Sequence, residues 1–428
     1  MGGVMARLED LLEDYATRPV PDSRTVGGLR VGMLYAAQAF SVPGLVTGVE
    51  IAGALGLSAS LVAFLAGGLF LTAVGSVTGY IGARVRLSSY MLIKFAFGEM
   101  GSKIVNFAFA LSQFGWFGVQ VYLFAQAAQG LGAEVLGLEI ERHVYVLAGG
   151  ALMIVSTMFG FKLLNRLAVV IVPLMIAVMA IMLYLALGSQ PLAAIFEVPG
   201  DLSVTPGQAI SAVVGSLVLG AILIPDVTRY AHTWKGGVSA SVITFFLAST
   251  FVYIAAAIPS LVTGEGDTLR VMIGMGLGIA AFALVILATW TTNSINLYGS
   301  SLSLSAVLSD VRGWKVTVGC GIAGTAAAFF GILDYFVPFL IYLSVVFIPV
   351  GGIYITDFFL VSGRNYRLED LAGRPAWAWP ALTAWAAGSA VSYLTSQGHL
   401  VLSTIPAVDA LAVAAAAYYL LIRLRATK

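Results

Sequence analysis

Apolar stretches of about 20 residues recur along almost the whole chain, separated by short stretches rich in polar residues, glycine or proline. A helix of that length and composition matches the hydrocarbon thickness of a lipid bilayer. We therefore expect an all-α polytopic membrane protein with twelve transmembrane helices. The predicted spans cover residues 28–54, 59–83, 103–131, 143–162, 165–188, 207–230, 237–263, 269–298, 314–333, 335–362, 377–395 and 401–423.

Two of these predicted spans contain residues that interrupt helices. They are Pro43 and Gly44 in span 1, and Gly215, Gly220 and Pro225 in span 6. Proline and glycine remove or weaken helical hydrogen bonds, and at membrane depth the freed backbone groups need protein, water, an ion or a substrate as partners. Because the two spans lie five apart, they indicate two inverted five-helix repeats with helices 1 and 6 broken. A pair of ordinary proline kinks is the alternative explanation.

This interpretation divides the chain into four parts. Residues 1–27 form a polar N-terminal tail, 28–188 the first repeat (helices 1–5), 207–362 the second repeat (helices 6–10), and 377–424 the additional helices 11 and 12. The tail lacks a basic segment that leads into an apolar run, so we interpret it as cytoplasmic rather than as a cleaved signal.

Charge is scarce and unevenly distributed. The chain is 59% hydrophobic and 10% charged, whereas soluble proteins carry about 25% charged residues. Lysine and arginine gather in the tail, at the C-terminal end and in the connections after even-numbered spans, whereas the other connections are mostly acidic. Basic connections remain in the cytoplasm. We therefore expect a multi-pass protein of the plasma (inner) membrane, embedded in the lipid bilayer, with both termini cytoplasmic.

Motifs typical of enzymes and nucleotide-driven pumps are missing from the sequence. Cys320 is the single cysteine, and His143, His232 and His399 lie in or beside predicted connections, too scattered for a metal site. No GxxxxGK[ST] motif is present. We expect no enzyme activity, no cofactor, no nucleic-acid partner and no obligate protein partner. A channel is the alternative from another class, but a channel needs a continuous polar pore, which interrupted helices do not indicate.

Polar side chains share one face of predicted span 3. Gln113, Trp116 and Gln120 are spaced i, i+3 and i+7, which places them on the same side of a helix. At membrane depth such groups normally face other helices or a cavity rather than lipid. They either hold helices together or bind a flat, hydrogen-bonding small molecule. The interrupted spans favour the binding interpretation.

Predicted span 8 offers oxygen and amide groups at membrane depth. The hydroxyls of Thr291 and Thr292 are uncharged oxygen donors, which together with carbonyl groups of an interrupted helix suit a sodium ion. Asn293 and Asn296 add amides that both donate and accept hydrogen bonds. Hydroxyls that bond to their own helix are the alternative. Four polar groups within six residues favour a polar cavity.

Three acidic residues fall within or near predicted spans. Asp226 precedes Arg229 by three residues, which predicts an ion pair within one helix. Asp357 lies near a basic connection and suits a structural anchor. Glu50, in the outer half of span 1, is a candidate for proton transfer or for a contact with the substrate.

Several motifs, taken in order and spacing, resemble the nucleobase–cation symporter family, in particular cytosine permeases and the related hydantoin transporters. The resemblance extends from about residue 27 to 362 and, more weakly, through span 12. It is carried by Gly79-Tyr80-Ile81-Gly82-Ala83, Phe97-Gly98, Gly101-Ser102, the segment from Gln113 to Val119, Trp290-Thr291-Thr292-Asn293, and Pro349-Val350-Gly351-Gly352 with Asp357.

The resemblance implies a LeuT-type fold and sodium-coupled import of a nucleobase-like heterocycle, with cytosine as the expected substrate. It implies that the base stacks on Trp116. A glutamine at the position of Gln113 is typical of cytosine permeases and one at the position of Gln120 is typical of hydantoin transporters; this chain has both. The resemblance further implies hydrogen bonds from Asn293, with Asn296 as an additional candidate.

The resemblance also implies a position for sodium between spans 1 and 8. The ligands would be the carbonyl groups of Ala36, Ala39 and Ala288 and the hydroxyls of Thr291 and Thr292.

The sequence departs from the family pattern at span 6. The family places an aromatic residue against the second face of the base, but here Gly215 and Ser216 are followed by Leu217. Glu50 also has no expected counterpart in cytosine permeases. A purine, a hydantoin or allantoin, or a hydroxymethylpyrimidine-type vitamin precursor therefore remains an alternative substrate, and a proton an alternative coupling ion.

Overall fold

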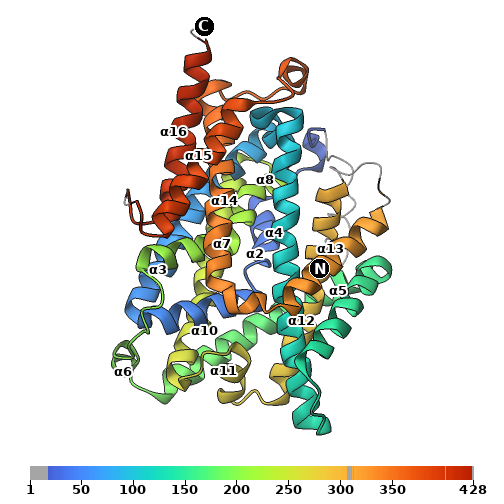
Figure 1. Ribbon diagram of the computed structural model, residues 1–428, viewed down its shortest axis with the longest axis vertical. Helices are drawn as coiled ribbons and strands as arrows, with labels where there is room; N and C mark the ends of the chain where they lie inside the picture. Colours follow the sequence, from blue (N-terminus) through green and yellow to red (C-terminus); the bar gives the residue numbers. More distant parts are fainter. Residues whose placement is uncertain (1–17, 306–310, 312, 401, 427–428) are drawn as a thin grey trace.

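The computed structural model describes residues 18–305, 311, 313–400 and 402–426. These residues form a helical bundle and no β-strand (Figure 1). Its helices are α2 (Gly28–Ala36), α3 (Val42–Val85), α4 (Ser89–Leu136), α5 (Arg142–Ser189), α6 (Leu192–Phe196), α7 (Pro206–Leu223), α8 (Pro225–Thr228), α9 (Trp234–Ser241), α10 (Ser249–Thr263), α11 (Thr268–Gly274), α12 (Ile279–Ser305), α13 (Gly313–Phe329), α14 (Phe336–Thr356), α15 (Trp379–Ser396) and α16 (Pro406–Ala426).

Short helical segments of other types connect these helices. The segment η2 (Val242–Ala248) is π-helical and joins α9 to α10, and η4 (Asp357–Val361) is π-helical and extends α14. Short 3₁₀ turns occupy Asp22–Arg24, Ile332–Tyr335 and Leu368–Gly373. Helices α15 and α16 pack against each other and against α14 at one edge of the bundle (Figure 1).

Two of the longest helices bend at glycines with left-handed backbone angles. Gly56 in α3 has φ 69° and ψ 176°, and Gly98 in α4 has φ 76° and ψ 177°. The 44 residues of α3 would reach about 66 Å if straight, roughly twice the bilayer core. The bend at Gly56 therefore lets α3 contain predicted span 2 and the second half of span 1.

Seven helical segments in the described residues are long and apolar enough to cross a membrane. Two shorter apolar helical segments, Arg142–Met158 and Ile279–Ser294, add to them. Predicted spans 4 and 5 fall within the single helix α5. The all-helical membrane architecture is confirmed, and the helices are compatible with twelve spans, whereas the boundaries of the two repeats stay a prediction.

Span 1 is interrupted, but just before the predicted positions, because Pro43 and Gly44 lie in the first turn of α3. Helix α2 ends at Ala36 and α3 begins at Val42, and the five residues between them are not helical. The Ala36 carbonyl accepts from the N–H of Ala39 at 3.0 Å, and the Ala39 carbonyl from that of Ser41 at 3.0 Å. This leaves a short stretch of irregular backbone in the middle of the bundle.

Span 6 is interrupted at Ile224, closer to its end than the glycines suggested. Helix α7 continues through Gly215 and Gly220 and stops at Leu223, and α8 begins at Pro225. Pro225 has no N–H to donate to the Ala221 carbonyl. The N–H of Val227 bonds to Ile224 instead of Leu223. The last carbonyl groups of α7 therefore need other donors.

Four hydroxyls from four different helices supply these donors. They bond to the consecutive carbonyls of residues 220–223, at distances of 2.7 Å for Tyr35 (α2), 2.7 Å for Thr78 (α3), 2.9 Å for Tyr354 (α14) and 3.1 Å for Ser89 (α4). We call this set the carbonyl clamp. The clamp gives hydrogen-bond donors to these four carbonyls, which could not remain without partners inside a membrane.

Candidate functional site

A cavity of about 510 Å³ lies between the two interrupted spans. The stretch from Leu34 to Gly44, which includes the interruption of span 1, forms one side, and residues of α4, α5, α7, α8, α10 and α12 form the remainder. The predicted site residues that line it are Gln113, Trp116, Gln120, Ser216, Leu217, Asn296, Ala39, Ala288, Thr291 and Thr292. Most of the residues predicted separately from spans 1, 3, 6 and 8 thus meet in one space.

The aromatic and amide face of α4 is directed into this cavity. The Trp116 ring is held edge-to-face by Phe336 and Phe339 of α14, with ring centroids 6.3 and 5.4 Å apart. Gln120 is 2% exposed, and its Oε1 has no hydrogen-bond partner among the described residues. A buried amide oxygen without a partner destabilises a structure by about 1–3 kcal/mol. A ligand that donates to this amide would remove that cost.

On α7, Ser216 and Leu217 line the cavity, whereas Gly215 does not. Gly215 lies where α7 approaches α14, and a methyl group at this position would overlap the backbone carbonyl of Leu340. In this conformation glycine is required here for helix packing, and the backbone at Gly215 faces α14 rather than the cavity.

Replacing Gly215 with alanine is expected to destabilise the protein by about 1–3 kcal/mol, because α7 and α14 must separate. Gly53→Ala in α3 is the matched control, since no atom lies near a methyl group there and alanine favours a helix. Thermal unfolding in detergent, followed by the loss of monodisperse protein, compares the two variants. An unchanged Gly215→Ala protein would contradict this account of the α7–α14 contact.

The α12 face carries the predicted sodium ligands. Ala288, Thr291 and Thr292 line the cavity together with Ala39, whereas Ala36 does not. Thr291 Oγ1 donates to the carbonyls of Leu287 at 2.8 Å and Ala288 at 3.1 Å. This back-bonding uses the hydroxyl proton but leaves oxygen lone pairs, which are what a cation needs. The Ala36 and Ala39 carbonyls each accept a single local bond and so retain a second lone pair. The Thr291 oxygen and the Ala36 and Ala39 carbonyls are compatible with sodium, whereas the Ala288 carbonyl already accepts from Thr291.

Asn293 lies on a different side of α12. Its side chain is fully buried, and Nδ2 donates to the Phe117 carbonyl and to Met153 Sδ, both at 3.0 Å. Asn293 therefore joins α12 to α4 and α5 and does not line the cavity. Asn296 does line it and offers an amide there.

Several cavity residues were not predicted from the sequence. Tyr35, Gln38 and Phe40 belong to or flank the interruption of span 1, and Tyr253 comes from α10. The signal for the first three was present, because they lie within the eight residues before Pro43. For Tyr253 there was no local signal. Phe40 and Tyr253 place aromatic rings around a cavity in which span 6 contributes Leu217.

The three acids have different surroundings. Glu50 is exposed on α3 and does not line the cavity, so its role in proton or substrate handling stays a prediction. Asp226 lines the cavity, and its Oδ1 accepts from the backbone N–H of Ser89 at 2.8 Å. Arg229 Nε donates to the backbone carbonyl of Asp226 at 3.0 Å. Asp226 thus fastens the start of α4 to α8.

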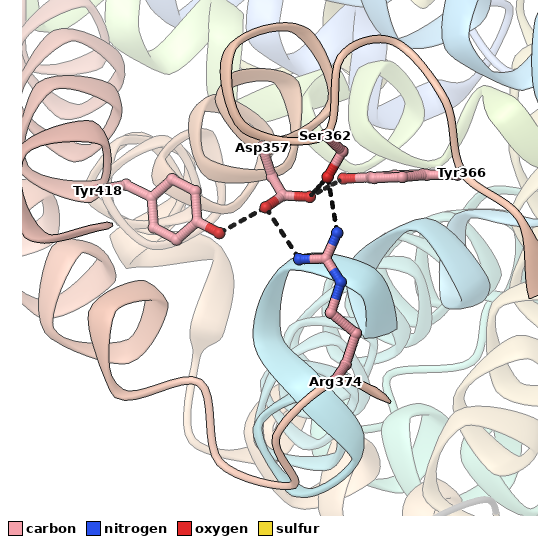
Figure 2. A network of polar contacts seen from close by, with 5 residues as sticks. All are labelled: Asp357, Ser362, Tyr366, Arg374 and Tyr418. Atoms are coloured by element: carbon pink, nitrogen blue, oxygen red, sulfur yellow. Dashed lines mark hydrogen bonds and ion pairs between the residues drawn. The ribbon is translucent and has the colours of Figure 1, made fainter. Parts of the chain in front are cut away.

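Asp357 is a structural anchor, as predicted (Figure 2). Its side chain is fully buried and accepts from Tyr418 at 2.7 Å, Tyr366 at 2.6 Å and Ser362 at 3.0 Å, while Arg374 completes an ion pair at 3.3 Å. Burial raises the pKa of Tyr366 well above its usual range, and the charge of Asp357 adds to this shift, so the phenol remains a donor. The network joins the end of α14 to α16 and to the connection before α15.

Residues 19–420 match the sequence model of a family described as permeases for cytosine/purines, uracil, thiamine and allantoin. The chain is 31% identical to the cytosine permease of Escherichia coli (strain K12) over 385 residues, which is 89% of each chain. It is 26% identical to the hydantoin permease of Microbacterium maritypicum over 423 residues, 90% of this chain and 84% of that protein.

The fold matches solved structures of one transporter, Mhp1, at 22% sequence identity. The inward-facing conformation of Mhp1 gives a TM-score of 0.83 and covers 96% of this chain and 93% of that one. The closed conformation, described as a nucleobase-cation-symport-1 family transporter with bromovinylhydantoin bound, gives 0.79, with 97% and 96% covered.

The family match spans nearly the whole chain, and the helices, the paired interruptions and the cavity agree with it. This chain is a multi-pass membrane transporter that belongs to the family of permeases for cytosine/purines, uracil, thiamine and allantoin.

Proposed function

We propose that the protein imports cytosine across the plasma membrane by sodium-coupled symport with alternating access. One observation carries this proposal: a single cavity brings the Trp116 ring together with the amides of Gln113, Gln120 and Asn296. A flat base needs an aromatic surface for stacking and amides for its polar edge. The similarity to a cytosine permease supports the choice of base.

Sodium is proposed to bind where the interruption of span 1 meets α12. The oxygen donors are the carbonyls of Ala36, Ala39 and Ala288 and the hydroxyls of Thr291 and Thr292. Four of these five residues already line the cavity. Bound sodium favours the outward-open state, and it does so by binding that state more tightly than the others. Movement of one helix group against the other then exposes the cavity to the cytoplasm.

The orientation follows from charge. Both termini lie in the cytoplasm, because lysine and arginine gather in the tail, in the connections after even-numbered spans and at the C-terminal end. In this orientation the part of the cavity near Asp226 is the cytoplasmic part.

A hydantoin is the second candidate substrate. Gln120, which the resemblance links to hydantoin transporters, is buried in the cavity wall with an unpaired Oε1, and the chain is similar to a hydantoin permease. Thermal-shift measurements on purified protein, with cytosine, uracil, purines, hydantoins and allantoin in the presence and absence of sodium, test both candidates. A ligand of the folded state raises the melting temperature with the logarithm of its concentration. Absence of any cytosine shift would contradict the first choice.

Thr292→Val is expected to raise the sodium concentration needed for half-maximal uptake by about tenfold, because one hydroxyl ligand is lost at nearly constant side-chain size. Cytosine uptake into proteoliposomes over a range of sodium concentrations measures this effect. Thr289→Val is the matched control: its hydroxyl bonds to the Val285 carbonyl, and the residue is fully buried outside the cavity. Uptake that depends on a pH gradient and not on sodium would indicate that a proton is the coupling ion. It would also support Glu50 as a proton-transfer residue.

A further inference from the structure

The cavity carries one formal charge among the described residues that line it. That charge belongs to Asp226, and the other lining residues are apolar or neutral polar. Asp226 is half-buried and lies in α8, at the end of the cavity that we assign to the cytoplasm. An ionisable group at such a place in a membrane protein is a candidate for function. Neither the stacking of a base nor the proposed sodium ligands make use of it.

Hydrogen bonds within the protein do not occupy the whole carboxylate. Oδ1 accepts from the backbone N–H of Ser89 at 2.8 Å, and within the described part of the chain Ser89 is the hydrogen-bonding neighbour of this carboxylate. A carboxylate has about four acceptor positions. Arg229 acts on Asp226 through its charge, but its guanidinium lies over the Tyr230 ring at 5.1 Å and does not line the cavity. The carboxylate therefore retains acceptor positions for a cation in the cavity.

Oxygen atoms lead from the proposed sodium position toward Asp226. Gln38 lies in the interruption of span 1, among the proposed carbonyl ligands, and its side chain lines the cavity. Tyr35 also lines the cavity, forms a hydrogen bond with Gln38 and is within electrostatic range of Asp226. The Tyr35 proton goes to the Gly220 carbonyl at 2.7 Å, so the phenol oxygen has lone pairs and no further proton to offer. These groups suit a cation that moves between the two positions.

We propose that Asp226 forms a second cation position, which sodium occupies on its way from the ligands around Thr291 and Thr292 to the cytoplasm. The first position consists of neutral oxygen donors, so a carboxylate in the same cavity attracts an ion that leaves it. The same charge helps sodium to enter from the cytoplasmic face when the transporter runs in reverse. This inference rests on the proposed function, because it takes sodium as the coupling ion, and it adds the route by which sodium is released.

Sodium dependence measured separately from the two membrane faces tests the proposal. Cytosine transport is followed in right-side-out and in inverted membrane vesicles, with sodium varied outside the vesicles; in inverted vesicles this is the cytoplasmic face. Asp226→Asn removes the charge, while its amide oxygen can still accept from Ser89. We expect this variant to raise the half-maximal sodium concentration by about tenfold in inverted vesicles and by less than about twofold in right-side-out vesicles, because an amide attracts a cation much less than a carboxylate does.

Asp226→Ala separates the charge from the contact with Ser89. Both variants lose the charge, so we expect the same shift of the sodium titration in inverted vesicles. Asp226→Ala alone also loses the acceptor of Ser89, so it alone is expected to lower the melting temperature. Asp370→Asn is the matched control for surface charge, at an exposed position in the connection before α15. We expect it to leave both sodium titrations unchanged.

The outcomes separate this inference from the proposed function. A sodium titration of Asp226→Asn that is unchanged, or shifted equally at the two faces, overturns the inference and leaves the proposed function intact. A loss of cytosine affinity with unchanged sodium dependence also overturns it and identifies the carboxylate as a substrate contact. If neither variant folds, Gln38→Leu decides: it removes one oxygen of the route, and an unchanged titration in inverted vesicles overturns the inference. If the unmodified protein transports cytosine without sodium, the sodium coupling and the inference fall together.

Discussion

Trp116→Ala is expected to lower the affinity for cytosine by about 5- to 150-fold, because stacking a base on an aromatic ring contributes about 1–3 kcal/mol. The ring is half-buried and is held by Phe336 and Phe339, so it is ordered before the ligand arrives and loses little freedom on binding. A dissociation constant measured on purified protein gives the effect directly.

Trp314→Ala is the matched control for this experiment. Trp314 is 52% exposed on α13 and lies outside the cavity, so its removal is the same chemical change without loss of stacking. Equal affinities of Trp116→Ala and the unmodified protein would show that the base does not stack on α4. Equal losses in both tryptophan variants would indicate a general weakening of the fold.

Asp357→Ala is expected to destabilise the protein by about 3–5 kcal/mol, the range found when one partner of a buried ion pair is removed. The change leaves the Arg374 guanidinium without its carboxylate and removes the acceptor of Tyr366 and Tyr418. The apparent melting temperature and the yield of monodisperse protein are the measurements.

Graded variants identify the origin of that loss. Tyr418→Phe removes one donor and keeps the charge pair, so about 1 kcal/mol is expected. Asp334→Ala, at an exposed aspartate, is expected to change stability by less than about 0.5 kcal/mol. If Asp357→Ala were as stable as Asp334→Ala, the network in Figure 2 would not be holding α14 and α16 together.

The sequence predicts best the features that depend on one helix alone. Gln113, Trp116 and Gln120 share a face because of helical periodicity, and they do line the cavity. The same periodicity explains the position of Asn293. One stripe along α12 contains Ala288, Thr291, Thr292 and Asn296. Asn293 is rotated by about 100° around the helix axis from Thr292, and so it faces another side.

The features that the sequence does not predict depend on contacts between helices. In the sequence, Gly215 suggests an interruption of the helix. In the structure it lies inside α7, where the lack of a side chain lets the helix approach the backbone of Leu340 in α14. Tyr253 enters the site because α10, which packs on α3 and α5, brings its hydroxyl to Ser216 of α7. Of the three interrupting positions in span 6, Pro225 alone coincides with the actual end of a helix, because it cannot donate to Ala221.

The carbonyl clamp has a consequence for how the transporter moves. Hydroxyl-to-carbonyl bonds contribute about 0.5–1.5 kcal/mol each, and in the clamp four of them attach one helix end to four other helices. Rotation of α7 relative to α8 would distort the hydrogen bonds to all four helices at once. The junction of α7 and α8 is therefore expected to be rigid. In the proposed alternating-access cycle, we expect the backbone to flex in the irregular segment between Ala36 and Val42. We also expect flexing at any clamp hydroxyl that exchanges its carbonyl partner for water.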